Sequence, residues 1–186
     1  MKKILLFYLI TIIISFSYPL NSKNTEILLN KEYSVKVFKY LKKAKKNVII
    51  SAYMWCCNPE KYYSIPCKML NIVINLVKKG VDVTIIFDRD VKSDSECNII
   101  TSKILKHTLF KKKYHNLHIY FDSPVVRSHE KLILVDGKYS FIGSHNITQS
   151  AFKYNNEVSV FIKSESVYKK LKKYLDKIIS VSSKIY

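Results

Sequence analysis

Residues 128–146 (SHEKLILVDGKYSFIGSHN) gather several side chains that suit the chemistry of a phosphate group. His129 and Lys131 are two positions apart at the start of a predicted strand, so their side chains point to the same face of a sheet. An imidazole and an ammonium group are unfavourable inside a strand unless they meet a polar partner. The apolar run at 132–135 then carries the chain into a core.

The second half of this segment returns the chain to the same place. Asp136-Gly137 is a tight-turn signal, and it predicts a hairpin whose second strand ends at Gly143. We expect the hairpin to bring Ser144 and Asn146 beside His129 and Lys131. A lysine charge together with hydroxyl and amide hydrogen bonds suits the non-bridging oxygens of a phosphate.

These residues resemble the H-x-K-x4-D-x6-G-S-x-N signature of the phospholipase D superfamily, with every defined position filled. Glu157, in Asn-Asn-Glu, resembles the downstream carboxylate that orients the nucleophilic histidine in that family. The resemblance implies these catalytic residues: His129, Lys131, Asp136, Ser144, Asn146 and Glu157. For Asp136, its place at the turn favours a capping role over direct catalysis. Gly143 and Arg127 are candidate substrate-binding residues, although Arg127 is equally explained as a solvated loop arginine.

The resemblance also implies a mechanism and an assembly. His129 would attack phosphorus to form a phosphohistidine, and a second histidine would act as general acid and then as base. The chain has a single H-x-K motif, and single-motif members of the family complete their site as homodimers across a two-fold axis. We therefore expect a homodimer that uses no cofactor and no metal, with lysine charge at the phosphate.

The charge of the chain bears on its partner. The formal net charge is +18, and removing Lys2 and Lys3 leaves +16. Such a charge favours a polyanionic partner, although a lysine-rich composition alone would also produce it. We favour nucleic acid as substrate and a non-specific exported endonuclease as function. An anionic or zwitterionic phospholipid substrate, or an inactive binding protein, are the alternatives. Basic clusters lie at 42–46, 111–113 and 169–173.

The N-terminus predicts export. Lys2 and Lys3 precede a nearly continuous apolar run at 4–16, which is short for a membrane span and typical of a secretory signal. Residues 1–22 are assigned as a signal peptide, or as an uncleaved membrane anchor, and 23–186 as the catalytic domain. The protein would be secreted or periplasmic, or held on the outer face of a membrane.

The four cysteines fit that location. An even number in an exported chain predicts disulfides, and a bond between the neighbours Cys56 and Cys57 would be strained. Each of these two would then pair with Cys67 or Cys97, in either combination. Buried thiols are the alternative reading.

Hydrophobic periodicity predicts an α/β protein. Strands are expected at 26–29, 47–53, 81–87, 117–121, 131–135, 140–143 and 158–162. Helices are expected at 34–46, 66–79, 95–110 and 164–180. Strands and helices alternate early and strands cluster late, which predicts a mixed sheet with helices on both faces, the phospholipase D-like fold.

Overall fold

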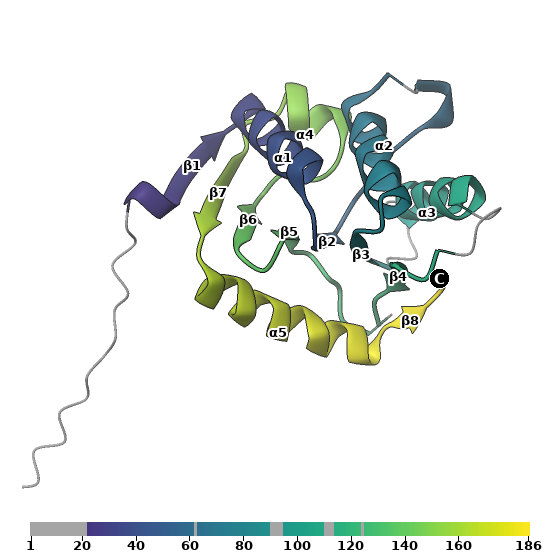
Figure 1. Cartoon of the computed structure of the whole chain (residues 1–186). Coiled ribbons are helices and arrows are strands. Elements are labelled where there is room, and N and C mark those ends of the chain that lie inside the picture. Colours follow the sequence, from purple (N-terminus) through teal and green to yellow (C-terminus); the bar gives the residue numbers. More distant parts are fainter. Residues whose placement is uncertain (1–21, 62, 90–94, 110–113, 124) are drawn as a thin grey trace, which may run out of the picture.

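A computed structural model describes residues 22–61, 63–89, 95–109, 114–123 and 125–186. The chain forms one eight-stranded sheet with the strand order β1-β7-β6-β5-β2-β3-β4-β8 (Figure 1). The strands are β1 (Thr25–Leu29), β2 (Asn47–Ala52), β3 (Asp82–Phe87), β4 (Leu117–Phe121), β5 (Lys131–Val135), β6 (Tyr139–Gly143), β7 (Val158–Lys163) and β8 (Ser183–Lys184).

The sheet is mixed, as expected. β2, β3 and β4 run parallel, which requires crossover helices between them, and all the other pairings are antiparallel. The hairpin of β5 and β6 pairs Leu132 with Ile142 and turns at Asp136-Gly137, where both residues have positive φ. This turn places the beginning of β5 and the end of β6 at the same edge of the sheet.

Helices cover both faces. α1 (Lys31–Lys43), α2 (Ile65–Lys78), α3 (Ser95–Leu109) and α4 (Gln149–Lys153) lie on one face, and α5 (Glu165–Val181) lies on the other (Figure 1). The alternation of β5 divides its side chains between two cores: Ile133 and Val135 pack under the four helices, while Leu132 and Leu134 pack against α5. Short 3-10 turns occupy Ser22–Asn24 and Pro59–Lys61.

The expected elements are confirmed within a few residues of their ends. Ser164 caps α5 by accepting a hydrogen bond from the Val167 amide, as its type and place predicted. α1 begins three residues earlier than its apolar spacing indicated, because Tyr33 is buried with Val37 and Leu41. α4 and β8 were not predicted, since five and two residues are too short to show a period.

Two disulfides join Cys56 to Cys97 and Cys57 to Cys67. This is one of the two combinations left open by the sequence, and no described cysteine is free. The bonds tie the segment after β2 to α2 and α3. The signal assigned to 1–22 lies outside the described residues except for Ser22. Among the helices that are described, none has the length and apolar character needed to span a bilayer.

Candidate active site

Five of the six predicted catalytic residues converge at one edge of the sheet. β5 begins there at Lys131, with His129 two residues before it, and Ser144 directly follows the end of β6. β7 starts there after Glu157, whose neighbour Val158 accepts a hydrogen bond from the Ser144 amide at 3.1 Å. The carboxyl ends of the parallel strands β2, β3 and β4 lie at the same edge, because the beginning of β5 pairs with the end of β2.

His129 and Lys131 are in direct contact. The imidazole is exposed, whereas Lys131 is only 9% exposed. The Lys131 Nζ lies 3.1 Å from His129 Nδ1 and donates to the His129 carbonyl oxygen at 2.6 Å. Lys131 is thereby held with its charge at the face of the histidine.

The electrostatics of the pair favour a neutral imidazole. Partial burial, the Lys131 ammonium and the Arg127 guanidinium lower the pKa of His129. Burial also lowers the pKa of Lys131, although the carboxylates of Glu130, Glu157 and Asp88 oppose this shift. A histidine with a lowered pKa keeps its lone pair near neutral pH, and that is the form a nucleophile needs.

Tyr53, just after β2, supports this pair from below. Its ring centroid lies 4.3 Å from that of His129, and the Lys131 Nζ lies 4.7 Å from the Tyr53 ring. Arg127 donates to the Tyr53 hydroxyl at 3.2 Å. Tyr53 therefore packs against both His129 and Lys131. Trp55 is fully buried and cannot stack on a substrate.

Ser144 and Glu157 form the other side of the site. The Ser144 hydroxyl donates to the Glu157 carboxylate, which also accepts a hydrogen bond from the side-chain Nδ2 of Asn155 at 3.1 Å. The expected contact between Glu157 and His129 is not among the hydrogen bonds of the described residues. Glu157 precedes β7 and therefore lies opposite the end of β6, which explains why it meets Ser144 first.

Asn146 holds an unpaired acceptor. Its Oδ1 atom is buried and has no hydrogen-bond partner among the described residues. A buried acceptor without a donor costs on the order of 1–3 kcal/mol. A donor supplied by substrate, water or a second subunit would remove that cost.

Asp136 is the one catalytic candidate that the structure does not bring to the site. It follows β5 at the end opposite Lys131, and its carboxylate accepts hydrogen bonds from the backbone amides of Lys45, Lys46 and Asn47 at 2.8–3.2 Å. The structure therefore places Asp136 away from the other catalytic candidates. Asp136 fixes the connection between α1 and β2 to the hairpin turn, in line with the capping role that its position favoured.

The two substrate-binding candidates differ. Arg127 is exposed beside His129, where it meets Tyr53, so it remains a candidate for holding substrate. Gly143 contributes through its lack of a side chain, because a Cβ atom there would overlap the Ser159 side chain of β7. The glycine thus permits the close approach that sets the position of Ser144.

The comparison with known families agrees with this geometry. Residues 37–179 match the family model described as "Cardiolipin synthase, PLD-like domain". The chain belongs to the phospholipase D superfamily.

Solved structures show the same phospholipase D-like fold. Nuc from Salmonella typhimurium, a phospholipase D family member, is 19% identical with a TM-score of 0.69, covering 86% of this chain and 97% of Nuc. NucT from Helicobacter pylori is 17% identical with a TM-score of 0.61, covering 85% of this chain and 96% of NucT. A curated polyphosphate kinase of Vibrio parahaemolyticus is 22% identical over 107 residues, which span 54% of this chain and 14% of the kinase.

Two buried acids support the phospholipase D-like site and were missed by the sequence analysis. Asp88 follows β3 and Asp122 follows β4, and each is 2% exposed. Both accept a hydrogen bond from the Ser128 amide, at 3.1 and 2.8 Å, directly before His129. Each acid comes directly after a buried strand, and this position was the available signal. The pair anchors the segment that delivers His129.

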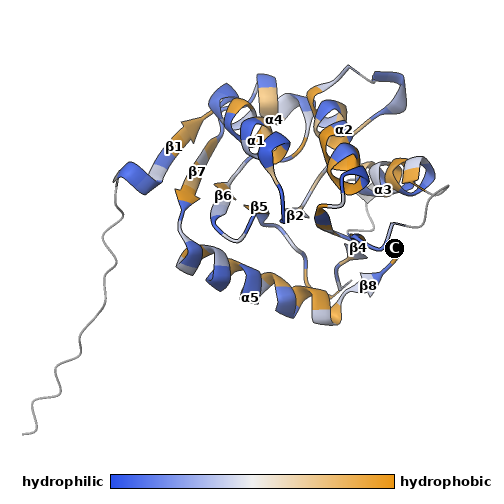
Figure 2. Cartoon of the chain, in the orientation of Figure 1, coloured by the Kyte–Doolittle hydropathy of each residue, from blue (hydrophilic) through white to orange (hydrophobic). Residues whose placement is uncertain are grey.

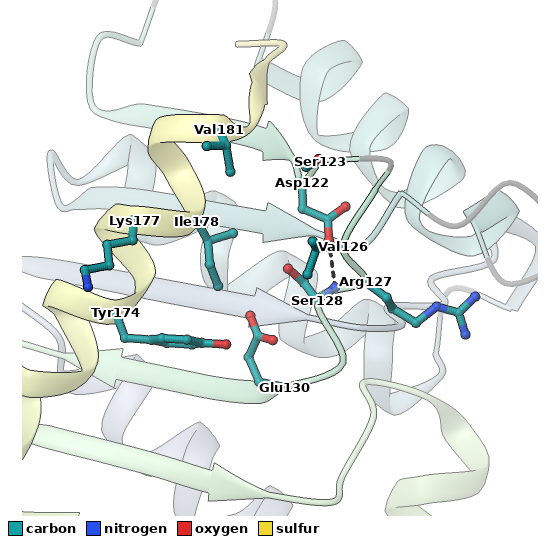
Figure 3. A pocket seen from close by; sticks show the side chains of 10 residues that line it. All are labelled: Asp122, Ser123, Val126, Arg127, Ser128, Glu130, Tyr174, Lys177, Ile178 and Val181. Atoms are coloured by element: carbon teal, nitrogen blue, oxygen red, sulfur yellow. Dashed lines mark hydrogen bonds between the residues drawn. The ribbon is translucent and has the colours of Figure 1, made fainter.

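A small cavity lies beside this anchor, on the α5 face of the sheet. Its volume is about 270 Å³, and Figure 3 shows the Tyr174 ring with its hydroxyl end pointing toward the Glu130 side chain. Other lining residues are Asp122, Ser123, Val126, Arg127, Ser128, Lys177, Ile178 and Val181. The cavity is largely apolar and adjoins both neighbours of His129. Within the described part of the chain, no group of three or more histidine, cysteine or acidic side chains could hold a metal ion.

Asp88 predicts a dependence of stability on pH. Burial and the nearby Asp122 raise its pKa from 3.8 to about 6. The pKa of Asp88 is higher in the folded state than in the unfolded state, so protonation of Asp88 stabilises the fold. This contribution to the free energy of unfolding is complete below about pH 4 and is lost as the pH rises through about 6. Asp88→Asn mimics the protonated acid, so it should gain Tm relative to wild type between pH 5 and 7.5, by about 2–4 °C.

Thermal unfolding at several pH values tests this prediction. Asp176→Asn, which alters an exposed carboxylate paired with Lys172 on α5, is the matched control and should leave the pH dependence unchanged. A parallel pH dependence in wild type and Asp88→Asn would contradict the assignment.

Proposed function

We propose that this chain is an exported phosphodiesterase that cleaves nucleic acid through a covalent phosphohistidine at His129. The observation that carries the proposal is the contact between His129 and Lys131, at the same sheet edge as Ser144. The lowered pKa of His129 favours its neutral form. A nucleophile and a positive charge are then in place for one phosphate. Export is supported by the two disulfides, which persist in oxidising compartments.

The proposed reaction has two displacements. An imidazole nitrogen of His129 attacks phosphorus and forms a P–N bond while the P–O bond to the leaving group breaks. The partner subunit's His129 protonates the departing oxygen and then takes a proton from water. That water attacks phosphorus, the P–N bond breaks, and His129 is restored with a phosphomonoester released. The developing charge is held by Lys131, Ser144 and Asn146.

The need for a second histidine makes a homodimer part of the proposal. Exposed apolar side chains support it on the α5 side of the sheet, on both flanks of the catalytic edge. On one flank, Leu29 and Val158 are cross-strand partners that are 49% and 55% exposed, and Ile27 continues the stripe (Figure 2). On the other flank, the exposed side chains of Val126, Tyr174 and Val181 line the cavity in Figure 3, and the exposed Val125 precedes Val126 in the chain. Apolar patches of this kind favour a protein partner.

Nucleic acid is favoured as substrate because of the net charge, which is +18 for the whole chain and +16 without Lys2 and Lys3. Lys177 on α5 lines the same cavity as Arg127 and is exposed, which makes it a candidate for holding a flanking phosphate. The basic run at 111–113 lies outside the described residues. The competing candidate is a phospholipid, supported by the apolar valines next to His129 and by the cardiolipin synthase description of the matching family model.

The deciding experiment offers the purified protein single-stranded DNA, double-stranded DNA, and vesicles of phosphatidylcholine or cardiolipin, with and without chelator. We expect cleavage of DNA that is unaffected by chelator. Efficient hydrolysis of lipid with intact DNA would replace the nuclease proposal by the phospholipase one. Activity that chelator removes and magnesium or zinc restores would contradict the metal-free mechanism.

Salt dependence gives a residue-level test of the same proposal. Each phosphate contact to single-stranded DNA contributes a log–log slope of about −0.7. Lys177→Gln should weaken binding to single-stranded DNA and flatten the slope by about that amount. Lys42→Gln removes the same charge from the end of α1, at the opposite edge of the sheet, and should change neither. Equal effects of the two variants would show that only overall charge matters.

A further inference from the structure

His145 is a buried histidine in the middle of the phosphate-binding pair. It separates Ser144 from Asn146 and is 1% exposed. Its ring lies on that of Tyr33, with centroids 4.2 Å apart and planes within 10°. The signature leaves this position undefined, so the motif assigns it no role.

The hydrogen bonds of His145 determine its tautomer. Its Nε2 lies 3.0 Å from the Asn30 carbonyl oxygen, which can only accept, so Nε2 carries the proton. Its Nδ1 lies 2.7 Å from Ser159 Oγ and accepts from that hydroxyl. Burial lowers the pKa of His145, although the Asn30 carbonyl and Glu157 oppose the shift. A neutral ring that donates on one side and accepts on the other satisfies both partners.

Asn30 extends this network to Glu157. It follows β1 and has a φ of 49°. This left-handed conformation is energetically unfavourable for any residue other than glycine. Its Oδ1 accepts from the Glu157 amide at 2.8 Å, and its own amide donates to the Glu157 carbonyl at 3.0 Å. Glu157 in turn accepts the Ser144 hydroxyl. The unfavourable backbone conformation of Asn30 is thus stabilised by its two hydrogen bonds to Glu157, which in turn binds Ser144.

Ser159 completes the network from β7. Its hydroxyl binds His145, and its side chain occupies the space that the absent Gly143 side chain leaves. Gly143 therefore packs directly against the side chain whose hydroxyl binds His145. Three strand ends, those of β1, β6 and β7, are joined at one imidazole.

We propose that His145 is a positioning residue that, through Asn30 and Ser159, holds Ser144, Asn146 and Glu157 in the geometry that binds the phosphoryl group. This inference rests on the proposed function for its catalytic consequence. His145 itself is buried behind the site and does not touch the substrate. Its effect is on the alignment of donors, and small misalignments of such donors cost large factors in rate.

The first test is Asn30→Gly. This substitution should not destabilise the fold, because glycine adopts a positive φ without strain. It retains the carbonyl that binds His145 and removes only the Oδ1 bond to Glu157. We expect unchanged or higher Tm, with kcat for bis(p-nitrophenyl) phosphate lowered about 10-fold and KM little changed. Wild-type kcat in this variant would show that the network does not position the site.

The second test acts on His145 directly. His145→Phe keeps the ring over Tyr33 and loses both hydrogen bonds, and it should lower kcat by about 10- to 100-fold. His145→Gln, which retains a donor for the Asn30 carbonyl, should recover part of the loss. Val83→Ala opens a cavity in β3 away from the site and is the control for lowered stability; its kcat below its Tm should equal that of wild type. Equal losses in Val83→Ala and His145→Phe would overturn the inference.

Binding of inorganic phosphate, measured by calorimetry, separates this inference from the proposed function. If wild type binds phosphate without hydrolysing any diester, and His145→Phe weakens the binding several-fold, the positioning role stands and the enzymatic proposal fails. If wild type is active and His145→Phe matches it in kcat and phosphate affinity, the positioning role fails alone. A wild-type protein that neither turns over nor binds phosphate would overturn both.

Discussion

His129→Ala should abolish phosphodiester hydrolysis, with kcat reduced by at least about 10⁴-fold, and should leave the fold intact. The large loss follows because His129 would form the covalent intermediate, and residual catalysis by binding groups alone is small. The fold should survive because the imidazole is exposed, so its removal leaves no core cavity. Kinetics with a small chromogenic diester and thermal unfolding measure the two effects separately.

His107→Ala is the matched control for this variant. His107 is an exposed histidine in the last turn of α3, away from the catalytic edge, and its removal should change neither kcat nor Tm by a measurable amount. Wild-type turnover in purified His129→Ala would contradict the mechanism. A covalent phosphohistidine trapped in wild type and absent from the variant would identify the nucleophile directly.

The hairpin that carries the site could be predicted from sequence because its signals are local. The apolar run at 132–135, the Asp136-Gly137 turn and the polar residues that follow Gly143 all act within one supersecondary unit. The bounds of β4 and β5 were predicted correctly for the same reason, since each is an apolar run between polar residues.

Contacts between distant segments were harder to predict. Asn30 meets Glu157 because β1 joins the far edge of the sheet beside β7, and nothing near either residue indicates that pairing. The carboxylates of Asp88 and Asp122 converge on the Ser128 amide for a similar reason, because the order of parallel strands decides which strand ends are neighbours. The role of Asp136 was also ambiguous in sequence, because a signature residue can serve the fold around a site as well as its chemistry.

Dimer formation can be tested at the apolar stripe on β1 and β7, which consists of Ile27, Leu29 and Val158. Ile27 is 65% exposed, pairs across to Val160 and faces the side opposite the buried Leu28. Ile27→Glu places a charge on this stripe at little cost to an exposed position of the isolated subunit. If the stripe packs against a second copy, the charge would be desolvated there, so we expect loss of the dimer and of activity together. Light scattering after size exclusion, with kcat measured at the same concentration, tests this expectation.

Val35→Glu provides the matched control, because Val35 is 71% exposed on α1, which covers the opposite face of the sheet. This variant should leave both the dimer and the turnover unchanged. Mixing His129→Ala subunits with wild type extends the test from assembly to chemistry. Each mixed dimer contains one imidazole where the two displacements need two, so mixed dimers should be severely impaired even though they assemble. Two results would show that one subunit suffices: full activity of a monomeric Ile27→Glu protein, or mixed dimers as active as wild type. The general acid and base would then have to come from the same chain as the nucleophile.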